Sequence, residues 1–371
     1  MYPNFFTYSF AGFFGRQFKR FYPEWEVEVW RLDSTIDEYM EAWIENVWFR
    51  IFPAVGNGHT GLYSWAFTKR LRALPAKTIL NVQWIHHPLL YSVLLLAPRN
   101  LIITAFHHGD WSPYFAFKYL KGFRRIKRLF YIATERLLIN RTDFFFILDK
   151  RDIPWLKRAY RKLEGRYTIQ PTGIDFSKYK GIPREEARKE LGLEPDKKYM
   201  FYLGQYYNYK EVDRLCEIYK RVREKDPDVR LMVAGGSPKD MYYNNIVECG
   251  AIDFGRQLQT DLYKFYSAAD VYVMVAFRDD MFGGIGQAPL EALACGTPVV
   301  SNSIRNMPDE IIDSVGKCPG NEEEMMDDIL FVLNHKADYI NCEKVARETF
   351  DVSVLQKKMF DIYSSLLKER S

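Results

Sequence analysis

The sequence contains little cysteine, and no arrangement of it that would staple a small fold or hold a metal ion. Its five cysteines are odd in number and widely spaced. They form neither a CxxC pair nor a Cys/His metal pattern. A disulfide scaffold and a zinc module are therefore excluded. We expect no metal site, and the cysteine usage is typical of a reducing, cytoplasmic setting.

Long hydrophobic runs and an export signal are also absent. The most apolar stretch, 92–106, is interrupted by Pro98, Arg99 and Asn100, whereas a bilayer crossing needs about 20 apolar residues. No basic segment followed by an apolar one opens the chain. The sequence predicts a protein that neither spans a membrane nor is exported.

Charge of one sign is scarce overall, because the formal net charge is only +4 for 371 residues. This total gives no support for nucleic-acid binding. Hydrophobic residues make up 47% and charged residues 27% of the chain, which is the balance of a globular protein. At about 150 residues per domain, the length predicts two domains.

The two halves differ in composition, since all eight tryptophans lie in the first and all five cysteines in the second. Apolar runs of strand length alternate with helical stretches in both halves, which indicates an α/β protein with two doubly wound parallel sheets. The expected strands are 25–30, 78–82, 101–106, 144–148, 199–203, 229–234, 271–275 and 298–301. Pro171 and Gly173 interrupt the pattern and mark the boundary. We predict domains at 1–170 and 171–351, followed by a helix over 352–371.

Glycines follow two expected strands of the second half, at the edge where open α/β sheets bind ligands. Gly204 and Gln205 come directly after 199–203, with Lys210 close behind, and Gly235 and Gly236 come directly after 229–234. Bare backbone turns near an ammonium group suit phosphate. We therefore predict a phosphate-binding edge here.

A third glycine-rich stretch runs over 283–286 and leads into an expected helix that starts at Gln287. Pro289 suits a first helical turn, and Gly296 suits the residue after the helix end. We place Glu291 in the first turn of this helix. It is either a ligand-binding acid or the acid that completes a helix cap.

Together these segments resemble the retaining glycosyltransferases of the GT-B fold, often called family 4. The residues that carry the resemblance are Tyr202-Leu-Gly-Gln205, Val233-Ala-Gly-Gly236, Phe265-Tyr-Ser-Ala-Ala-Asp-Val-Tyr-Val273, Gly284-Ile-Gly286 and Glu291-Ala-Leu-Ala-Cys-Gly-Thr-Pro-Val-Val300. Pro171-Thr-Gly-Ile-Asp175 is similar to the family's interdomain segment. The resemblance implies two Rossmann-like domains facing each other across a cleft, the acceptor domain first and the nucleotide-sugar domain second.

The resemblance also implies a role for each motif. Glu291 would bind the ribose hydroxyls, and Lys210 would neutralise the leaving diphosphate. The donor's sugar and diphosphate would contact Gly204, Gln205, Gly235, Gly236, Gly283, Gly284, Ile285 and Gly286. Amides and an ammonium placed there stabilise the leaving group, so no cofactor is expected beyond a UDP- or GDP-type sugar substrate. The implied enzyme is a metal-independent, retaining hexosyltransferase acting on an acceptor hydroxyl of a glycan or lipid-linked acceptor.

Two positions depart from the family pattern. Gln205 stands where the family usually has arginine, and Gly283 stands where it usually has a second acid. Asp280 is our candidate substitute for that acid, unless it and Asp279 are solvated loop residues. These departures leave an alternative open, namely a GT-B protein that binds sugar nucleotide without turnover.

In the first half the resemblance is thinner. His108 follows an expected strand and would lie beside the reacting sugar, with His107 as the alternate. Either could instead be a structural histidine. Gly12 resembles the family's first glycine loop, or it simply begins a helix. The family's first strand would end near Tyr2 and Pro3, so we expect that the true start lies upstream or that a strand is missing.

One local charge cluster stands out, because 118–128 is dense in lysine and arginine among aromatics. Such a helix either contacts an anionic membrane surface or is a solvated helix face. The first reading predicts peripheral binding at the inner membrane face.

Overall fold

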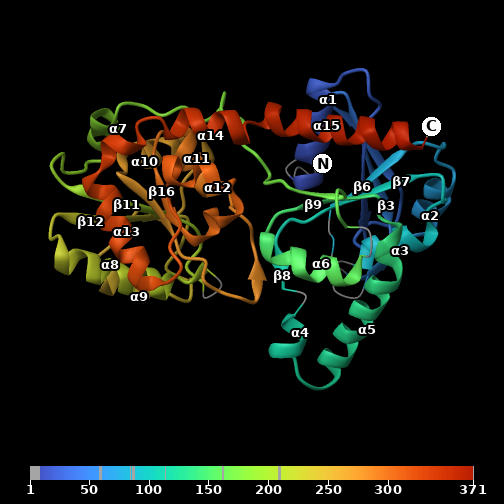
Figure 1. Ribbon diagram of the computed structural model, residues 1–371, viewed down its shortest axis with the longest axis horizontal. Coiled ribbons are helices and arrows are strands. Elements are labelled where there is room, and N and C mark those ends of the chain that lie inside the picture. Colours follow the sequence, from blue (N-terminus) through green and yellow to red (C-terminus); the bar gives the residue numbers. More distant parts are fainter. Residues whose placement is uncertain are drawn as a thin grey trace. The chain divides into compact units, whose positions relative to one another are not determined.

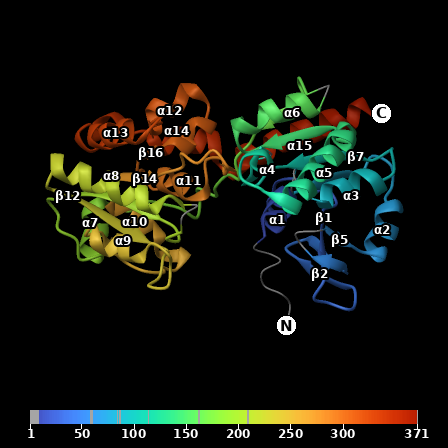
Figure 2. The same cartoon turned by 90° about the horizontal axis from the view of Figure 1, so that it is seen from below.

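The computed structural model describes residues 9–57, 61–83, 85, 88–112, 114–160, 163–207 and 210–370. Within them the chain divides into two compact units, labelled in Figures 1 and 2. The first unit consists of the described residues of Met1–Thr172, Asp280–Phe282 and Leu355–Ser371. The second consists of those of Gly173–Asp279 and Gly283–Val354.

The second unit is built around a parallel sheet. Its strands are β11 (Lys198–Leu203), β12 (Val229–Ala234), β13 (Ile252–Asp253), β14 (Val271–Met274), β16 (Val299–Ser301) and β17 (Gly316–Lys317). They lie in the order β13-β12-β11-β14-β16-β17, and each pair is parallel. This is the doubly wound order 3-2-1-4-5-6, in which the strand order reverses between the first and fourth strands.

Helices connect these strands and supply the rest of the core. They are α7 (Arg184–Glu190), α8 (Val212–Lys225), α9 (Tyr243–Glu248), α10 (Leu262–Ala268), α11 (Gln287–Ala294), α12 (Asp309–Val315), α13 (Glu322–Asn334) and α14 (Cys342–Phe350). The strands predicted in this half are confirmed to within one residue at each end. They were readable because buried parallel strands are continuous apolar runs.

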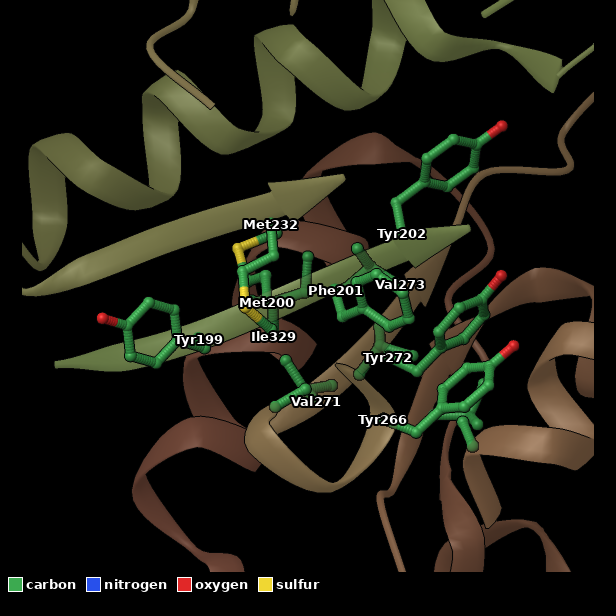
Figure 3. Close-up of a cluster of buried hydrophobic side chains, with 14 of the residues drawn as sticks. Tyr199, Met200, Phe201, Tyr202, Met232, Tyr266, Val271, Tyr272, Val273 and Ile329 are labelled. Carbon is green, nitrogen blue, oxygen red and sulfur yellow. The ribbon is translucent and has the colours of Figure 1, made fainter. Parts of the chain in front are cut away.

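The core of the second unit is unusually rich in tyrosine. Tyr199, Tyr202, Tyr266 and Tyr272 are all almost completely buried among apolar side chains. In Figure 3 the hydroxyls of Tyr202, Tyr266 and Tyr272 lie toward the arrowhead of β11, and that of Tyr199 lies at the other end of the strand. Phenol groups therefore gather under the carboxyl edge of the sheet.

The first unit contains a parallel sheet and a smaller mixed sheet. Its strands are β1 (Glu28–Asp33), β2 (Met40–Ile44), β3 (Val47–Pro53), β4 (Val55–Asn57), β5 (Gly61–Tyr63), β6 (Ile79–Val82), β7 (Ile102–Phe106), β8 (Asp110–Trp111), β9 (Phe144–Ile147), β10 (Tyr167–Ile169) and β15 (Met281–Phe282). Strands β10-β9-β7-β6 form the parallel sheet, and β1-β3-β2 form the mixed one.

The helices of the first unit pack on both faces of the parallel sheet and extend beyond it. They are α1 (Phe10–Phe21), α2 (Trp65–Arg72), α3 (Pro88–Leu96), α4 (Phe115–Lys118), α5 (Gly122–Leu138), α6 (Ile153–Ala159) and α15 (Val352–Glu369). Side chains of α1 and α15 pack with Phe106 and Phe146 in one core, while α2 and α3 contribute to another with Phe145. None of the described helices is both long enough and apolar enough to cross a bilayer.

The strand predicted at 25–30 is only partly right. The observed strand β1 begins at Glu28 and pairs with β3 in the mixed sheet, not with the parallel sheet. The prediction missed the hairpin of β2 and β3, which turns at Glu45 and Asn46 with φ of 49° and 64°. A two-residue turn with both φ values positive is the type I′ hairpin turn, and asparagine is its usual signal.

The chain passes from one unit to the other at four places, and the first and last of these lie next to each other. The N–H of Ile174 bonds to the carbonyl of Phe350 at 3.1 Å, and the N–H of Val352 bonds to the carbonyl of Ile174 at 2.9 Å. Residues from Leu355 onward belong to the first unit. Helix α15 therefore begins beside the first crossing and continues into the core of the first unit.

Candidate functional site

The carboxyl edge of the second unit's sheet carries the glycine turns. Gly204 follows β11, Gly235 follows β12, and the loop containing 283–286 follows β14 and leads into α11. Strands β11 and β14 are neighbours in the sheet, and the strand order reverses between them. Crevices at such switch points are where open α/β sheets bind their ligands.

Glycine is required at different positions of this edge for different structural reasons. A Cβ on Gly236 would lie 2.1 Å from Cε2 of Tyr206, and one on Gly204 would lie 2.5 Å from the hydroxyl of Tyr202. Packing against tyrosine rings therefore excludes a side chain at both. Gly235 has φ of +96°, and a Cβ there would approach the backbone of Gly204 at 3.1 Å. Close packing within the protein therefore explains the glycines of these turns, whether or not a ligand binds there.

The loop Gly283–Gly286, which we call the glycine loop, is different. A Cβ on Gly283 would meet no described atom within 4 Å, so its bare backbone faces open space. Gly284 and Gly286 have φ of +62° and +83°, which side chains rarely adopt. The turn therefore requires glycine at 284 and 286, whereas Gly283 leaves the backbone accessible.

The N-terminus of α11 follows this loop without a side-chain cap. Its N-cap residue is Gly286, and no side-chain hydrogen bond caps the helix. The first-turn N–H groups and the positive end of the helix dipole are therefore available to an anion. This is the arrangement that binds phosphate at helix N-termini.

The C-terminus of α11 is capped by Gly296, as predicted. Gly296 has φ of +78°, its N–H bonds to Leu293, and the N–H of Thr297 bonds to Ala292. These two bonds form a Schellman motif. The prediction of Gly296 as the residue after the helix end is confirmed, and so is the place of Pro289 in the first turn.

Glu291 is the fifth residue of α11, so our placement of it in the first turn was wrong. It is 4% exposed, and both carboxylate oxygens accept tyrosine hydroxyls. Tyr179 donates to Oε1 at 2.8 Å, and Tyr266 donates to Oε2 at 2.7 Å. The helix-cap alternative is therefore wrong, because these bonds lead away from the backbone of the first turn.

Burial controls the acidity of this carboxyl group. Desolvation raises the pKa of Glu291, and the hydrogen bonds from Tyr266 and Tyr179 lower it. Burial of the neighbouring hydroxyl, together with the charge of Glu291, raises the pKa of Tyr266 well above its usual value. Each carboxylate oxygen retains a second lone pair, so Glu291 can accept two further hydroxyl groups.

Lys210 and Glu211 lie where the chain enters α8. Lys210 is exposed, but protein atoms crowd its ammonium group, and this partial desolvation lowers its pKa. Glu211 is buried with a left-handed backbone at φ of 50° and ψ of 39°. Its carboxylate accepts hydrogen bonds from the backbone N–H of Arg278 at 3.1 Å and from Nη1 of Arg214 at 2.7 Å. Glu211 thus ties the start of α8 to the loop that follows β14.

Sequence reasoning missed Tyr179, Tyr266 and Glu211 as parts of this edge. Tyr266 lies inside the motif 265–273 that we had used only for its resemblance, so a signal was present. Tyr179 and Glu211 carry no local signal, because their partners Glu291 and Arg278 are distant in sequence.

Asp280 belongs to the first unit, whereas Gly283 and Glu291 belong to the second. The carbonyl of Asp280 accepts the N–H of Ser112 at 2.8 Å, and the next two residues form β15, which pairs with β8. Asp280 is 5% exposed, so the solvated-loop alternative does not hold for it. Its assignment to the donor sugar stays a prediction.

His108 is held between aromatic rings. Its ring stacks on Phe10 at 4.5 Å and on Phe106 at 4.7 Å, and its Nε2 lies 2.5 Å from Oε1 of Gln83. Burial, with a smaller effect of His107, lowers the pKa of His108 to about 3. This packing supports the structural alternative, and the catalytic assignment of His108 stays a prediction.

Gly12 does not lie in a glycine loop. It is in the first turn of α1, and its N–H already bonds to Oγ of the N-cap residue Ser9 at 3.1 Å. The loop predicted there was therefore wrong, and the helix-start alternative is confirmed. A role for Gly12 in donor binding stays a prediction, and Tyr2 and Pro3 lie outside the described residues.

Among the described residues no group of three or more histidine, cysteine, aspartate or glutamate side chains could hold a metal ion. In the part of the chain that the structure describes, the carboxyl edge of the second unit instead presents backbone amides, the ammonium group of Lys210 and the buried carboxylate of Glu291, while the carboxylate of Glu211 is paired with Arg214 and Arg278. This set suits a ligand with a diphosphate and neighbouring hydroxyl groups, such as a nucleotide.

Comparison with known proteins agrees with this geometry. Residues 183–349 match the family of glycosyl transferases group 1. A D-inositol 3-phosphate glycosyltransferase of Mycobacterium marinum is 26% identical over 191 residues, which are 49% of this chain and 39% of that protein. The chain spans about two fifths of the length of the curated relatives it matches.

Two solved structures extend the likeness to both units. A sucrose-phosphate synthase of Thermosynechococcus elongatus superposes with a TM-score of 0.71 at 16% identity, covering 97% of this chain and 93% of that one. HepE of Anabaena, solved with UDP-glucose, gives a TM-score of 0.63 at 15% identity over 86% and 87%. Apart from Asp280–Phe282, the residues that match the glycosyl transferases group 1 lie within the second unit. The chain has the GT-B fold, so the predicted fold and family are confirmed.

Proposed function

We propose that this protein transfers a sugar from a nucleoside diphosphate sugar to an acceptor hydroxyl, with retention at the anomeric carbon. The observation that carries the proposal is the uncapped start of α11 behind the glycine loop, with Glu291 one turn further on. The UDP-glucose bound by HepE supports UDP as the nucleotide. The acceptor is proposed to be a glycan or lipid-linked hydroxyl.

In the proposed reaction, the bond between the anomeric carbon and the diphosphate oxygen breaks. The acceptor oxygen bonds to the same face of that carbon, and its proton passes to the leaving diphosphate. Negative charge grows on the diphosphate as it leaves. The amides of the glycine loop, the start of α11 and the Lys210 ammonium are the groups that stabilise this charge.

Glu291 is proposed to accept the two ribose hydroxyls. Its carboxylate is fixed by Tyr179 and Tyr266, so little side-chain entropy is lost when the ribose binds. A carboxylate that is already oriented also discriminates in favour of a neighbouring pair of hydroxyls. We propose that turnover needs no divalent cation, which is tested by assaying activity in excess EDTA.

The decisive experiment measures nucleotide binding and donor consumption with the full chain. Titration calorimetry with UDP, GDP and ADP should show binding of one of the uridine or guanosine nucleotides. Release of that nucleotide from its sugar donors should then be measured for the wild type, Lys210→Ala and the matched surface variant Lys189→Ala. Loss of the ammonium should lower turnover about 100-fold, with Lys189→Ala unchanged.

Two outcomes would contradict the proposal. If no nucleotide binds, the carboxyl edge is not a donor site. If a nucleotide binds but none of the donors is consumed, the protein is a sugar-nucleotide binder without turnover, which is the alternative suggested by Gln205 and Gly283.

A further inference from the structure

Helices α4 and α5 form a distinct part of the first unit, and their lower ends extend beyond its sheet in Figure 1. The inner side of α5 is held in place by Ile132 and Glu135, which are 6% and 2% exposed. Glu135 accepts hydrogen bonds from Nε1 of Trp155 at 3.0 Å and from the hydroxyl of Tyr91 at 2.7 Å. The orientation of α5, and therefore its outward side, is fixed by these contacts.

The outward side of α5 is apolar. Phe123, Ile126, Phe130 and Leu137 are 79%, 65%, 68% and 81% exposed, and we call them the exposed stripe. Their separations of 3, 4 and 7 residues place them on one face of a helix that spans 17 residues. The outward face of a helix in a water-soluble protein is normally polar. The exposed stripe departs from this pattern, whereas Lys121, Arg124 and Arg125 are solvated, so both interpretations of 118–128 stay predictions.

The charged residues in the first half of α5, and those just before it, are all of one sign. Lys118, Lys121, Arg124, Arg125, Lys127 and Arg128 lie within or just before the first turns of α5. The sequence has no aspartate or glutamate between Ser112 and Thr134. The next acid, Glu135, is buried on the inner side. A helix with a large apolar stripe and basic residues on its other sides is typical of helices that lie in the interface of a membrane.

We propose that α4 and α5 dock the protein on an anionic bilayer surface. The exposed stripe would enter the boundary between headgroups and acyl chains, and the basic residues would contact the anionic headgroups. The charge pattern selects this occupant. A second copy of this chain would bring like charges together across the interface, and such contacts are unfavourable.

The proposal predicts a binding energy with two separable parts. Each basic residue near an anionic surface strengthens partitioning of the protein onto the membrane about fivefold. Each phenylalanine that becomes buried in the membrane strengthens it about tenfold or more. The electrostatic part should weaken at high salt, because the screening length falls as ionic strength rises. The apolar part should not.

The experiment is flotation of the full chain with vesicles of phosphatidylcholine alone or with 30% phosphatidylglycerol added. We expect binding to the anionic vesicles only. The triple variant Lys121→Gln, Arg124→Gln and Arg125→Gln should lower it about a hundredfold. A control triple of exposed basic residues elsewhere in the first unit, Lys69→Gln, Lys157→Gln and Arg158→Gln, should leave most of the binding intact.

A second variant pair tests the exposed stripe. Phe123→Ser with Phe130→Ser should lower binding about a hundredfold at both low and high salt, whereas Leu95→Ser with Ile340→Ser, at other exposed apolar sites, should not. All of these side chains are exposed, so the unfolding midpoints should match the wild type. Equal binding to neutral vesicles, or binding unaffected by both test variants, would overturn the proposal.

Two further outcomes are informative. If sedimentation shows a concentration-dependent dimer that the phenylalanine variants abolish, the stripe is an interface between copies and the membrane proposal is wrong. Calorimetric titration with UDP separates this inference from the proposed function. A variant of the basic residues or of the exposed stripe that still binds UDP but no longer binds vesicles supports membrane docking independently of the proposed function. Vesicle binding by a wild-type protein that does not bind UDP would contradict only the proposed function.

Discussion

Removal of one hydroxyl group tests how the buried Glu291 is stabilised. In Tyr266→Phe, Oε2 of Glu291 loses a donor at 2.7 Å while the ring is kept. Tyr266 is fully buried, so water cannot take the place of the hydroxyl. A hydrogen bond to a charged group contributes about 1.5–3 kcal/mol. We therefore expect a loss of about 2 kcal/mol in the free energy of unfolding of the second unit at pH 8.

The pH dependence gives the sharper test. Burial already raises the pKa of Glu291, and the loss of a donor raises it further. A carboxyl group whose pKa is higher in the folded state than in the unfolded state binds protons more readily when folded. The destabilising effect of the buried carboxyl group therefore grows as the pH rises from the unfolded-state pKa to the folded-state pKa. It fades as the pH falls toward the ordinary pKa of 4.5. The difference between Tyr266→Phe and wild type should shrink as the pH falls from 8 to 5.

The assay is urea unfolding followed by tyrosine fluorescence and circular dichroism at several pH values, with Tyr179→Phe as the matched control. Tyr179 is only partly buried and also accepts a hydrogen bond from Gln259, so its loss should cost under about 1 kcal/mol. The reasoning fails if the two variants are equally destabilised, or if the cost of Tyr266→Phe is the same at pH 5 and pH 8.

Two further predictions concern glycine and histidine. Gly236→Ala should lower the unfolding free energy by about 1–3 kcal/mol, because its Cβ would meet the Tyr206 ring, whereas Gly283→Ala should stay within about 0.5 kcal/mol. Equal urea midpoints for the two would contradict the packing argument. The His108 ring, with its pKa lowered to about 3, should show no protonation by NMR between pH 8 and pH 5. Because protonation favours the unfolded chain, stability should fall as the pH drops below 6.5, and a titration near 6.5 would refute this burial.

The second unit was largely predictable because its elements are encoded locally. Strand β12 is an apolar run interrupted only by Arg230 and followed by glycine, and it matches the predicted 229–234 at both ends. Gly296 identifies the end of α11 because few other residues tolerate its positive φ, and Pro298 marks the same boundary because proline disrupts a helix. Such signals need no knowledge of distant contacts.

The mixed sheet of the first unit was not predictable in the same way. Alternation over 25–30 indicates a strand but does not say which strand it pairs with. The pairing of β1 with β3 is a contact between segments distant in sequence, and α1 packs against β1. A Cβ on Gly15 would lie 2.6 Å from Val29, which shows how close that packing is.

The sequence by itself determined the class of fold and the places where backbone must be bare, since periodicity and backbone conformation are local properties, and its motifs carried the resemblance to the family. Tertiary structure alone decided what those residues do. It directed Glu291 to two tyrosines instead of a helix cap, used Gly236 for ring packing, buried His108 between phenylalanines and left the outer side of α5 apolar. Each outcome depends on atoms distant in the sequence, and such contacts exist only once the chain has folded.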